Sequence, residues 1–587
     1  MKKNSFRLSV LLTFSLFLSV GCDQYSDAQS GDLNDDVLGQ YSPSMEMPSP
    51  TLSGSFLSAQ FAQNRSDWEA ASNYFAKILD TSPTDKEIQI RLMALQMGSG
   101  HYDQAIQIAN KISKSEGADK TLANLILALE SFKSGKFQES LKVISGDQND
   151  PVVLAILPLV KSWAEAGKGA TDITELKDSP SLIYQAVLVA AYTKNKDALA
   201  QLAQSYDFVK TRTPVARLED IAVIFAHYGE TEESKGIYEA LKAGIPERAA
   251  FYDTQIKNLE TESKKNLPNQ LSNPQVGLSD AIFDMAQILS RGYEDSARLF
   301  AHMSLYLNPD NAAAYELLAE IASDHKLYSE ATTYLSRIDT SGDKNRKIQI
   351  QRQIAQLQVL AGYPDEAIRI LETLASDHKN IDAQIQIGDI YRGQEDFKNA
   401  LKAYNRAYDF LGNAITAQYW DLSFARGMTN ERLKNWDQAE KDLKTALLFQ
   451  PDQPYVLNYL GYSWADQGIH LDKAAELIEK AVRLKPDDGA IVDSLGWIYF
   501  RMGQYDKAVV TLEKAIELAP TEPELNDHLG DAYWRVGRKN EAKFQWKRAV
   551  SFTSDSSLIE KIQSKIDAGL PENILVNQKT EKVVENK

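Results

Sequence analysis

Cysteine is almost absent from this chain of 587 residues, which contains only Cys22. Because a disulfide needs two cysteines, neither a disulfide within the chain nor a cysteine-rich metal site is possible. The seven histidines are scattered, and none forms an i, i+4 pair with a third ligand nearby. A phosphate-binding loop, a dinucleotide-binding fingerprint and a GxSxG motif are missing as well. The sequence therefore predicts no catalytic residues, no bound metal and no cofactor.

Basic residues are outnumbered by acidic ones. The chain has 64 lysines and arginines against 81 aspartates and glutamates, which gives a net charge of −17. Nucleic-acid binding needs clustered lysine and arginine, so we predict no nucleic-acid partner. An acidic surface is also common on soluble secreted proteins and does not by itself indicate a specific partner. Runs of alternating β-branched residues are missing too, so the sequence predicts an all-α fold.

The N-terminus has the pattern of an export signal. A basic segment, MKKNSFR, precedes an apolar run, LSVLLTFSLFLSV, of 13 residues. This run is too short to span a bilayer comfortably but suits a secretory signal peptide, which we place at residues 1–21. Residues 23–50 contain six acidic residues, no lysine or arginine, and many serines, glycines and prolines. Because this composition cannot form a packed core, we predict a disordered acidic tether over 22–50.

A unit of about 34 residues is repeated almost three times between residues 454 and 550. The shared positions are a glycine in the first half of each unit and two alanines in the second half, namely Gly461, Gly496 and Gly530, then Ala474, Ala508 and Ala542, then Ala481, Ala515 and Ala549. This is the tetratricopeptide (TPR) pattern of two antiparallel helices. A small residue in the first helix lets the second helix lie close. Neighbouring pairs must stack because one pair cannot bury its apolar face.

The same alanine can be traced towards the N-terminus and sets the domain boundaries. It recurs at steps of 33 to 39 residues at Ala542, Ala508, Ala474, Ala439, Ala400, Ala367, Ala331 and Ala297. We therefore predict a TPR array of eight helical hairpins over 278–550, within a TPR solenoid or superhelix. Ala71, Ala105 and Ser140 predict further TPR-like repeats over 51–146. Residues 147–277 are either a hinge or diverged repeats of a continuous superhelix, 551–570 a capping helix that begins near Asp555, and 571–587 a polar tail.

The resemblance to TPR proteins implies a binding groove. In that family, positions 2, 5, 9, 12 and 13 of the first helix line the concave face. Carried onto the three clear repeats, these positions are Tyr455, Asn458, Tyr462, Asp493, Trp497, Phe500, Arg501, Asp527, Asp531, Trp534 and Arg535. Aromatic and arginine side chains dominate binding hot spots, so this set predicts a protein-binding groove. The alternative is that the aromatic residues only pack between adjacent repeats. Asn458, Asp493 and Asp527 differ from the lysine and asparagine clamp of TPR domains that bind C-terminal carboxylates, which disfavours that ligand.

The small residue and cysteine that end the apolar run resemble the lipobox of bacterial lipoproteins. That resemblance implies that Cys22 is lipidated, palmitate included, and holds the chain on an envelope membrane, inner or outer, facing the periplasm. An ordinary signal peptide with a cysteine there by chance is the alternative.

Lipobox, tether and repeats together resemble proteobacterial TPR lipoproteins. One type is the adaptor of a periplasmic carboxyl-terminal processing protease and presents peptidoglycan hydrolases to it. The resemblance implies a non-enzymatic scaffold whose partners are a protease and cell-wall enzymes. The alternatives are a scaffold for cell-wall synthesis or envelope export machinery and, more remotely, an envelope enzyme.

Overall fold

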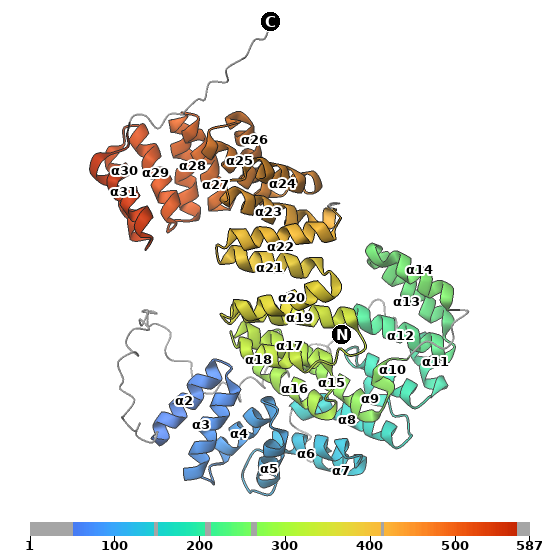
Figure 1. Ribbon diagram of the computed structural model, residues 1–587. Coiled ribbons are helices and arrows are strands. Elements are labelled where there is room, and N and C mark those ends of the chain that lie inside the picture. Colours follow the sequence, from blue (N-terminus) through green and yellow to red (C-terminus); the bar gives the residue numbers. More distant parts are fainter. Residues whose placement is uncertain (1–50, 146–150, 206–212, 260–266, 413–415, 572–587) are drawn as a thin grey trace, which may run out of the picture. The chain divides into compact units, whose positions relative to one another are not determined.

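The computed structural model describes residues 51–145, 151–205, 213–259, 267–412 and 416–571. All regular structure in these ranges is helical (Figure 1), which confirms the all-α prediction. The chain divides into two compact units, Met1–Gly362 and Tyr363–Lys587. The predicted signal peptide, Cys22 and the tether lie outside the described residues, as does the polar tail beyond residue 571.

The first unit is a succession of helices and two short 3-10 turns. Its elements are α2 (Leu52–Asn64), α3 (Trp68–Thr81), α4 (Lys86–Gly98), α5 (Tyr102–Ile112), α6 (Thr121–Lys133), α7 (Phe137–Ile144), α8 (Pro151–Gly167), α9 (Thr174–Lys177), α10 (Ile183–Tyr192), α11 (Lys196–Ser205), α12 (Val215–Tyr228), α13 (Thr231–Gly244), η4 (Pro246–Arg248), α14 (Ala249–Asn258), η5 (Asn269–Leu271), α15 (Pro274–Leu289), α16 (Glu294–Leu307), α17 (Ala312–Asp324), α18 (Tyr328–Ser336) and α19 (Lys344–Leu360).

The N-terminal helix pairs of this unit pack against a helix two hundred residues later in the chain. Arg298 of α16 is 2% exposed. Its Nε donates to the carbonyl oxygen of Gly98 at 2.9 Å and its Nη1 to that of Ser66 at 3.2 Å. Its Nη2 is paired with Glu330 of α18. One buried guanidinium thus joins α4 and the turn before α3 to α16 and α18.

The region predicted as a hinge or as diverged repeats is tied to α15 by a polar network. Arg217 of α12 donates to Asp280 at 2.8 Å and to Asp284 at 2.7 Å. Gln185 of α10 donates to Asp280 at 3.1 Å and accepts from Trp163 of α8 at 3.1 Å. The helices α8, α10 and α12 are therefore fixed to the first helix after the region, because each supplies a partner for a buried charge or amide.

The second unit continues the helical pairs and ends in a single helix. Its elements are α20 (Pro364–His378), α21 (Ile381–Gly393), α22 (Phe397–Phe410), η6 (Ala417–Tyr419), α23 (Trp420–Arg432), α24 (Trp436–Phe449), α25 (Pro454–Gln467), α26 (Leu471–Leu484), α27 (Gly489–Arg501), α28 (Tyr505–Leu518), α29 (Pro523–Arg535), α30 (Lys539–Ser551) and α31 (Ser556–Ala568).

The glycines of the repeat are needed because a helix passes directly over them. A Cβ atom at Gly461, Gly496 or Gly530 would lie 2.7, 2.5 or 2.5 Å from a side chain of the paired helix, where real Cβ atoms are essentially never found. The alanines Ala474, Ala508 and Ala542 of the paired helices are fully buried. Close approach of the two helices therefore explains the small residues that define the sequence pattern.

The boundary between the units falls inside a predicted repeat. The predicted hairpin with Ala367 on its second helix, α20, has α19 as its first helix, whereas the structure places the division between these two helices, after Gly362. The residues around this point bury little apolar surface: Leu360 is 51% exposed and Tyr363 60%. The array predicted over 278–550 is thus distributed over two compact units.

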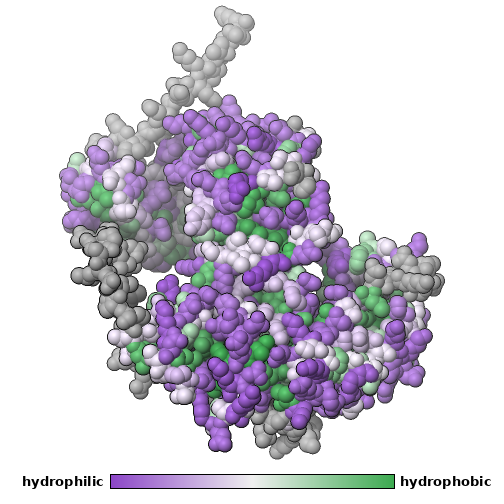
Figure 2. All heavy atoms as spheres, turned by 60° about the horizontal axis from the view of Figure 1, so that its bottom comes forward, coloured by the Kyte–Doolittle hydropathy of each residue, from purple (hydrophilic) through white to green (hydrophobic). Residues whose placement is uncertain are grey.

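The described helices lack the combination of length and apolar character that crossing a membrane requires. Figure 2 shows a face on which hydrophilic side chains predominate and hydrophobic ones form small patches. Single apolar side chains such as Leu448 and Val510 protrude from the surface, as isolated apolar residues commonly do.

Candidate protein-binding groove

The predicted groove residues lie on the first helices of the last three pairs, α25, α27 and α29. In each helix the central members are four residues apart, as are Asp493, Trp497 and Arg501 on α27. Side chains at this spacing share one face of a helix. The structure therefore places these central members on corresponding faces of the first helices of three successive pairs.

An aromatic stack and an ion pair connect α27 to α29. The ring of Trp497 lies parallel to that of Phe500 at 4.9 Å and to that of His528 at 4.1 Å between centroids. His528 Nδ1 lies 2.9 Å from Asp493 Oδ2, and both residues are buried. Burial alone lowers the pKa of His528, but Asp493, with Glu524 and Asp527, raises it to about 9. The imidazole is therefore a cation near neutral pH, held against a carboxylate and an aromatic face.

Two buried carboxylates of α29 hold a lysine of the terminal helix. Asp527 and Asp531 are 4% and 3% exposed, and each places both oxygens 2.8 Å from Nζ of Lys565 on α31. Asp531 also accepts from the indole of Trp546 at 2.9 Å. Burial and the neighbouring Asp527 raise the pKa of Asp531, although Lys565 opposes this. Both carboxylates of the triad therefore share one cation, which the chain itself supplies.

The remaining predicted residues of α29 contact the segment after α31. Arg535 donates to the carbonyl oxygen of Pro571 at 2.6 Å. A Cβ at Gly569 would lie 2.1 Å from the ring of Trp534, so only glycine fits beneath this indole. The structure corrects the prediction that Asp527, Asp531, Trp534 and Arg535 face an open groove, because α31 and the residues up to 571 occupy that face.

The structure also corrects the prediction that Phe500 lines the groove. It is 4% exposed and belongs to the apolar core formed by α27 to α31, as the packing alternative for the aromatic residues states. Trp497 is partly buried against the same core.

The face of α25 is the more open part. Tyr455 is 42% exposed, and its hydroxyl accepts from Lys485 at 2.6 Å. Tyr462 is half-buried, and its pKa is raised by burial and then by the carboxylates of Glu524, Asp466 and Asp493. Acidic side chains from α25, α27 and α29 thus surround one tyrosine.

Several polar atoms of the predicted residues are buried and have no hydrogen-bond partner. They comprise two acceptors and three donors: Asn458 Oδ1, Asp493 Oδ1, Trp497 Nε1, Arg501 Nε and Arg535 Nε. Buried polar atoms in native proteins are nearly always paired, so each unpaired atom calls for an explanation. Four of the five belong to α25 and α27, against which α31 does not pack in the described part of the chain. A bound peptide supplies both donors and acceptors and would pair them.

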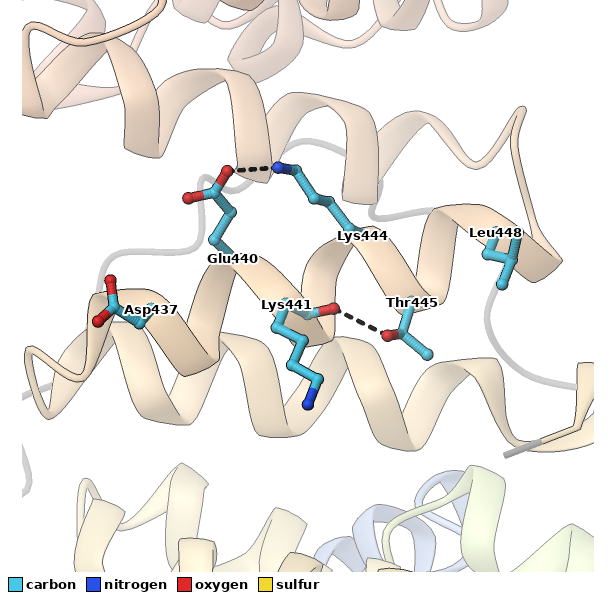
Figure 3. Close-up of a pocket in the computed structure, with 6 residues that line it drawn as sticks. All are labelled: Asp437, Glu440, Lys441, Lys444, Thr445 and Leu448. Atoms are coloured by element: carbon cyan, nitrogen blue, oxygen red, sulfur yellow. Dashed lines mark hydrogen bonds and ion pairs between the residues drawn. The ribbon is translucent and has the colours of Figure 1, made fainter. Parts of the chain in front are cut away.

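Two hollows elsewhere in this unit provide a comparison. One, of about 570 Å³, is lined only by α24: Asp437, Glu440, Lys441, Lys444, Thr445 and Leu448 (Figure 3). Lys444 pairs with Glu440 at 2.6 Å, and Thr445 donates to the carbonyl oxygen of Lys441 at 2.8 Å. The other, of about 730 Å³, lies among α22, α23 and α24 around the paired Arg426 and Asp442. Each hollow thus contains an ion pair formed within the chain, Glu440 with Lys444 in the first and Arg426 with Asp442 in the second.

Sequence reasoning missed His528 and Lys565, the two buried cations of the site. His528 has no repeat position that marks it. Lys565 carried a weak signal, because it lies between Ile562 and Ile566 on the apolar side of its helix. In the described residues, no group of three or more histidines, cysteines, aspartates and glutamates could hold a metal ion.

Comparison with known proteins identifies repeat units in both parts of the chain. Models described as "Tetratricopeptide repeat" match residues 64–129, 381–410 and 424–489, and one described as "TPR repeat" matches 496–537. The TPR repeat-containing protein PA4667 of Pseudomonas aeruginosa is 30% identical over 196 residues, which are 33% of this chain and 32% of that protein. The BBSome complex member BBS4 of Bos taurus is 31% identical over 109 residues, 18% of this chain and 20% of that protein.

The chain thus spans about a third and a fifth of the length of these two relatives. Among solved structures, the APC/C hetero-tetramer Cut9–Hcn1 aligns with 88% of this chain and 96% of its own, at 15% identity and a TM-score of 0.36. The repeat matches and the helical pairs confirm that this chain has the all-α tetratricopeptide-repeat fold.

Proposed function

We propose that this chain is an interaction scaffold that binds another protein along the face of α25 and α27 that carries the predicted residues. The observation that carries the proposal is the set of unpaired polar atoms on Asn458, Asp493, Trp497 and Arg501. They lie beside the half-buried Tyr462 and the stacked ring of Trp497. Aromatic surface combined with unsatisfied donors and acceptors is the composition of a protein-binding hot spot.

Site-specific crosslinking tests the binding face. A photoreactive phenylalanine analogue at Tyr462 should crosslink a partner in the cells that make the protein. The same analogue at Val510, which is 69% exposed on the second helix of its pair, is the matched control. Partner bands of equal strength at both positions, or only at Val510, would contradict the assignment.

We further propose that the chain is anchored by a lipid on Cys22 and faces the periplasm. The basic segment, the short apolar run and the cysteine after a small residue support this proposal. Cys22→Ala should move the protein from the membrane fraction to the soluble fraction. Unchanged fractionation of the variant would refute lipidation.

The partner we propose is a carboxyl-terminal processing protease, to which the scaffold delivers peptidoglycan hydrolases. Support comes from the resemblance of lipobox, acidic tether and repeats to the adaptor lipoproteins of such proteases. Purification of the intact protein from solubilised membranes should recover a serine protease. Recovery of cell-wall synthases without a protease would favour the alternative scaffold role, and peptidoglycan cleavage by the purified chain alone would favour an enzyme.

A further inference from the structure

The terminal helix α31 shows what this type of surface accepts. It covers the face of α29, and its most buried polar contact there is the insertion of Lys565 between Asp527 and Asp531. The neighbouring residues supply apolar contact, since Ile562 is fully buried and Leu570 is 6% exposed. The main chain contributes as well, because the carbonyl oxygen of Pro571 accepts a hydrogen bond from the side chain of Arg535. The occupant of the α29 face is therefore a helix with a lysine, an apolar side and a main-chain acceptor.

Two residues of α27 have counterparts in α29 one repeat later, and α29 lies beside α27, where its His528 takes one oxygen of Asp493. Asp493 and Arg501 stand 34 residues before Asp527 and Arg535. Asp493 is 4% exposed, its Oδ2 is paired with His528, and its Oδ1 has no partner. A buried carboxylate with one free oxygen has capacity for a second cationic donor.

Around Asp493 the carboxylates of Glu524, Asp466 and Asp527 outnumber the cations of His528 and Arg501. Glu524 and Asp466 act on the same tyrosine as Asp493, and the side chain of Asp466 is 62% exposed. Arg501 is drawn to Asp466, with its Nη2 donating to that residue's carbonyl oxygen at 3.3 Å and its Nη1 lying 4.0 Å from the carboxylate. An approaching carboxylate would meet repulsion here, whereas a lysine or arginine would meet attraction.

We propose that the face of α25 and α27 binds a segment of a partner protein that presents a lysine or arginine to Asp493. The main chain of that segment pairs with Asn458, Trp497 and Arg501, and its apolar side chains lie on Trp497 and Tyr462. This rests on the proposed scaffold function and names the chemistry of its partner. The segment resembles α31 in having a cation beside apolar side chains.

A peptide titration with the full-length protein tests the charge preference. The probe is a synthetic peptide of residues 553–571, which carries Lys561 and Lys565. The comparators are the same peptide with both lysines replaced by glutamine and with both replaced by glutamate. We expect the lysine peptide to bind at least about tenfold more tightly than the glutamine peptide, and the glutamate peptide not to bind, as a desolvated charge pair requires. Equal binding of all three would overturn the proposal.

A matched pair of variants separates binding from folding. Asp493→Asn and His528→Gln both break the same ion pair, but only the first removes the anionic acceptor. We expect Asp493→Asn to weaken lysine-peptide binding at least about tenfold, and His528→Gln to leave it unchanged or stronger. Equal losses in both would show that the ion pair acts only through structure. A further variant combines Asp466→Lys with Glu524→Lys. Both residues are exposed, so this double substitution should abolish peptide binding without unfolding the chain.

Mapping the crosslink at Tyr462 distinguishes failure of this inference from failure of the proposed function. Mass spectrometry of the crosslinked partner peptide should find a lysine or arginine within a few residues of the attachment point. A segment without a basic residue would refute the charge preference while the scaffold function stands. No crosslink at Tyr462 would refute both.

Discussion

Replacing Lys565 by methionine removes the cation from the buried triad but keeps most of the side-chain volume. Lys565 is 11% exposed at its side chain, and its partners Asp527 and Asp531 are 6% and 4% exposed. The substitution leaves two carboxylates close together in a site with little water. Breaking a buried ion pair by removing one partner costs about 3–5 kcal/mol, and the upper part of this range applies here because two carboxylates lose the same cation.

The effect should be local to the end of the solenoid, because repeat stability is a sum over units and their interfaces. Unfolding in urea should therefore show an early loss of signal from Trp534 and Trp546, which lie next to α31. Lys561→Met is the matched control, since Lys561 is exposed on the same helix, and should change the stability by less than about 0.5 kcal/mol.

The pH dependence gives a second signature. Lys565 opposes the rise in the pKa of Asp531, so in the variant this pKa rises further and the folded state binds a proton that the unfolded state releases. Stability of Lys565→Met should therefore recover as the pH falls below neutral, and its gap to the unmodified protein should narrow. A loss below about 1 kcal/mol, or a loss equal to that of Lys561→Met, would refute the reasoning that the triad fixes α31.

Three further predictions concern other parts of the structure. Gly496→Ala should destabilise the second unit by about 1–3 kcal/mol, because the new Cβ would lie 2.5 Å from a leucine of α28. Gly236 has open space around it, so Gly236→Ala should stabilise the chain by about 0.5–1 kcal/mol. Urea unfolding of both variants measures these changes. The stabilising contribution of His528 should be complete below about pH 6.5 and be lost as the pH rises through about 9, which a pH series of unfolding midpoints with His528→Gln as control would detect. Arg298→Met should cost about 3–5 kcal/mol and accelerate hydrogen exchange in α4, while the exposed Arg291→Met should not.

Much of the fold follows from the sequence because the repeat encodes contacts between neighbours. Gly496 needs to be small because α28 passes over it, and Ala508 because it lies in that same interface. These constraints act within one period of 34 residues, so a single sequence displays them. The N-terminal helices pack on α16 by contrast through Arg298 and Gly98, which are 200 residues apart. A period-34 pattern holds no information about such a contact.

The positions of the predicted groove residues follow from the repeat, but the groups that cover them do not. The alignment of repeats puts Asp493 and Asp527 at the same position of two helices, α27 and α29. The alignment does not show that the chain itself covers Asp527, because the covering residue, Lys565, lies on a helix outside the repeat. Nor does it reveal that a histidine of the next repeat takes one oxygen of Asp493. Such choices depend on which cation lies within reach in three dimensions.

A continuous series of charged residues connects Lys565 of the terminal helix α31 to Asp493 of α27. Lys565 contacts Asp527 and Asp531, both of which act electrostatically on or with His528, and His528 in turn holds Asp493. When Lys565 is removed, His528 becomes the nearest cation for the two carboxylates of α29, so its hold on Asp493 weakens.

Asp493 is then the better acceptor for a basic segment. We therefore expect Lys565→Met to bind the lysine peptide more tightly than Lys561→Met does. Binding at the vacated face of α29 would give the same trend, so Asp493→Asn is combined with each variant. A gain that disappears in the combined variant supports the linkage through His528, and a gain that persists shows that the peptide simply replaces α31.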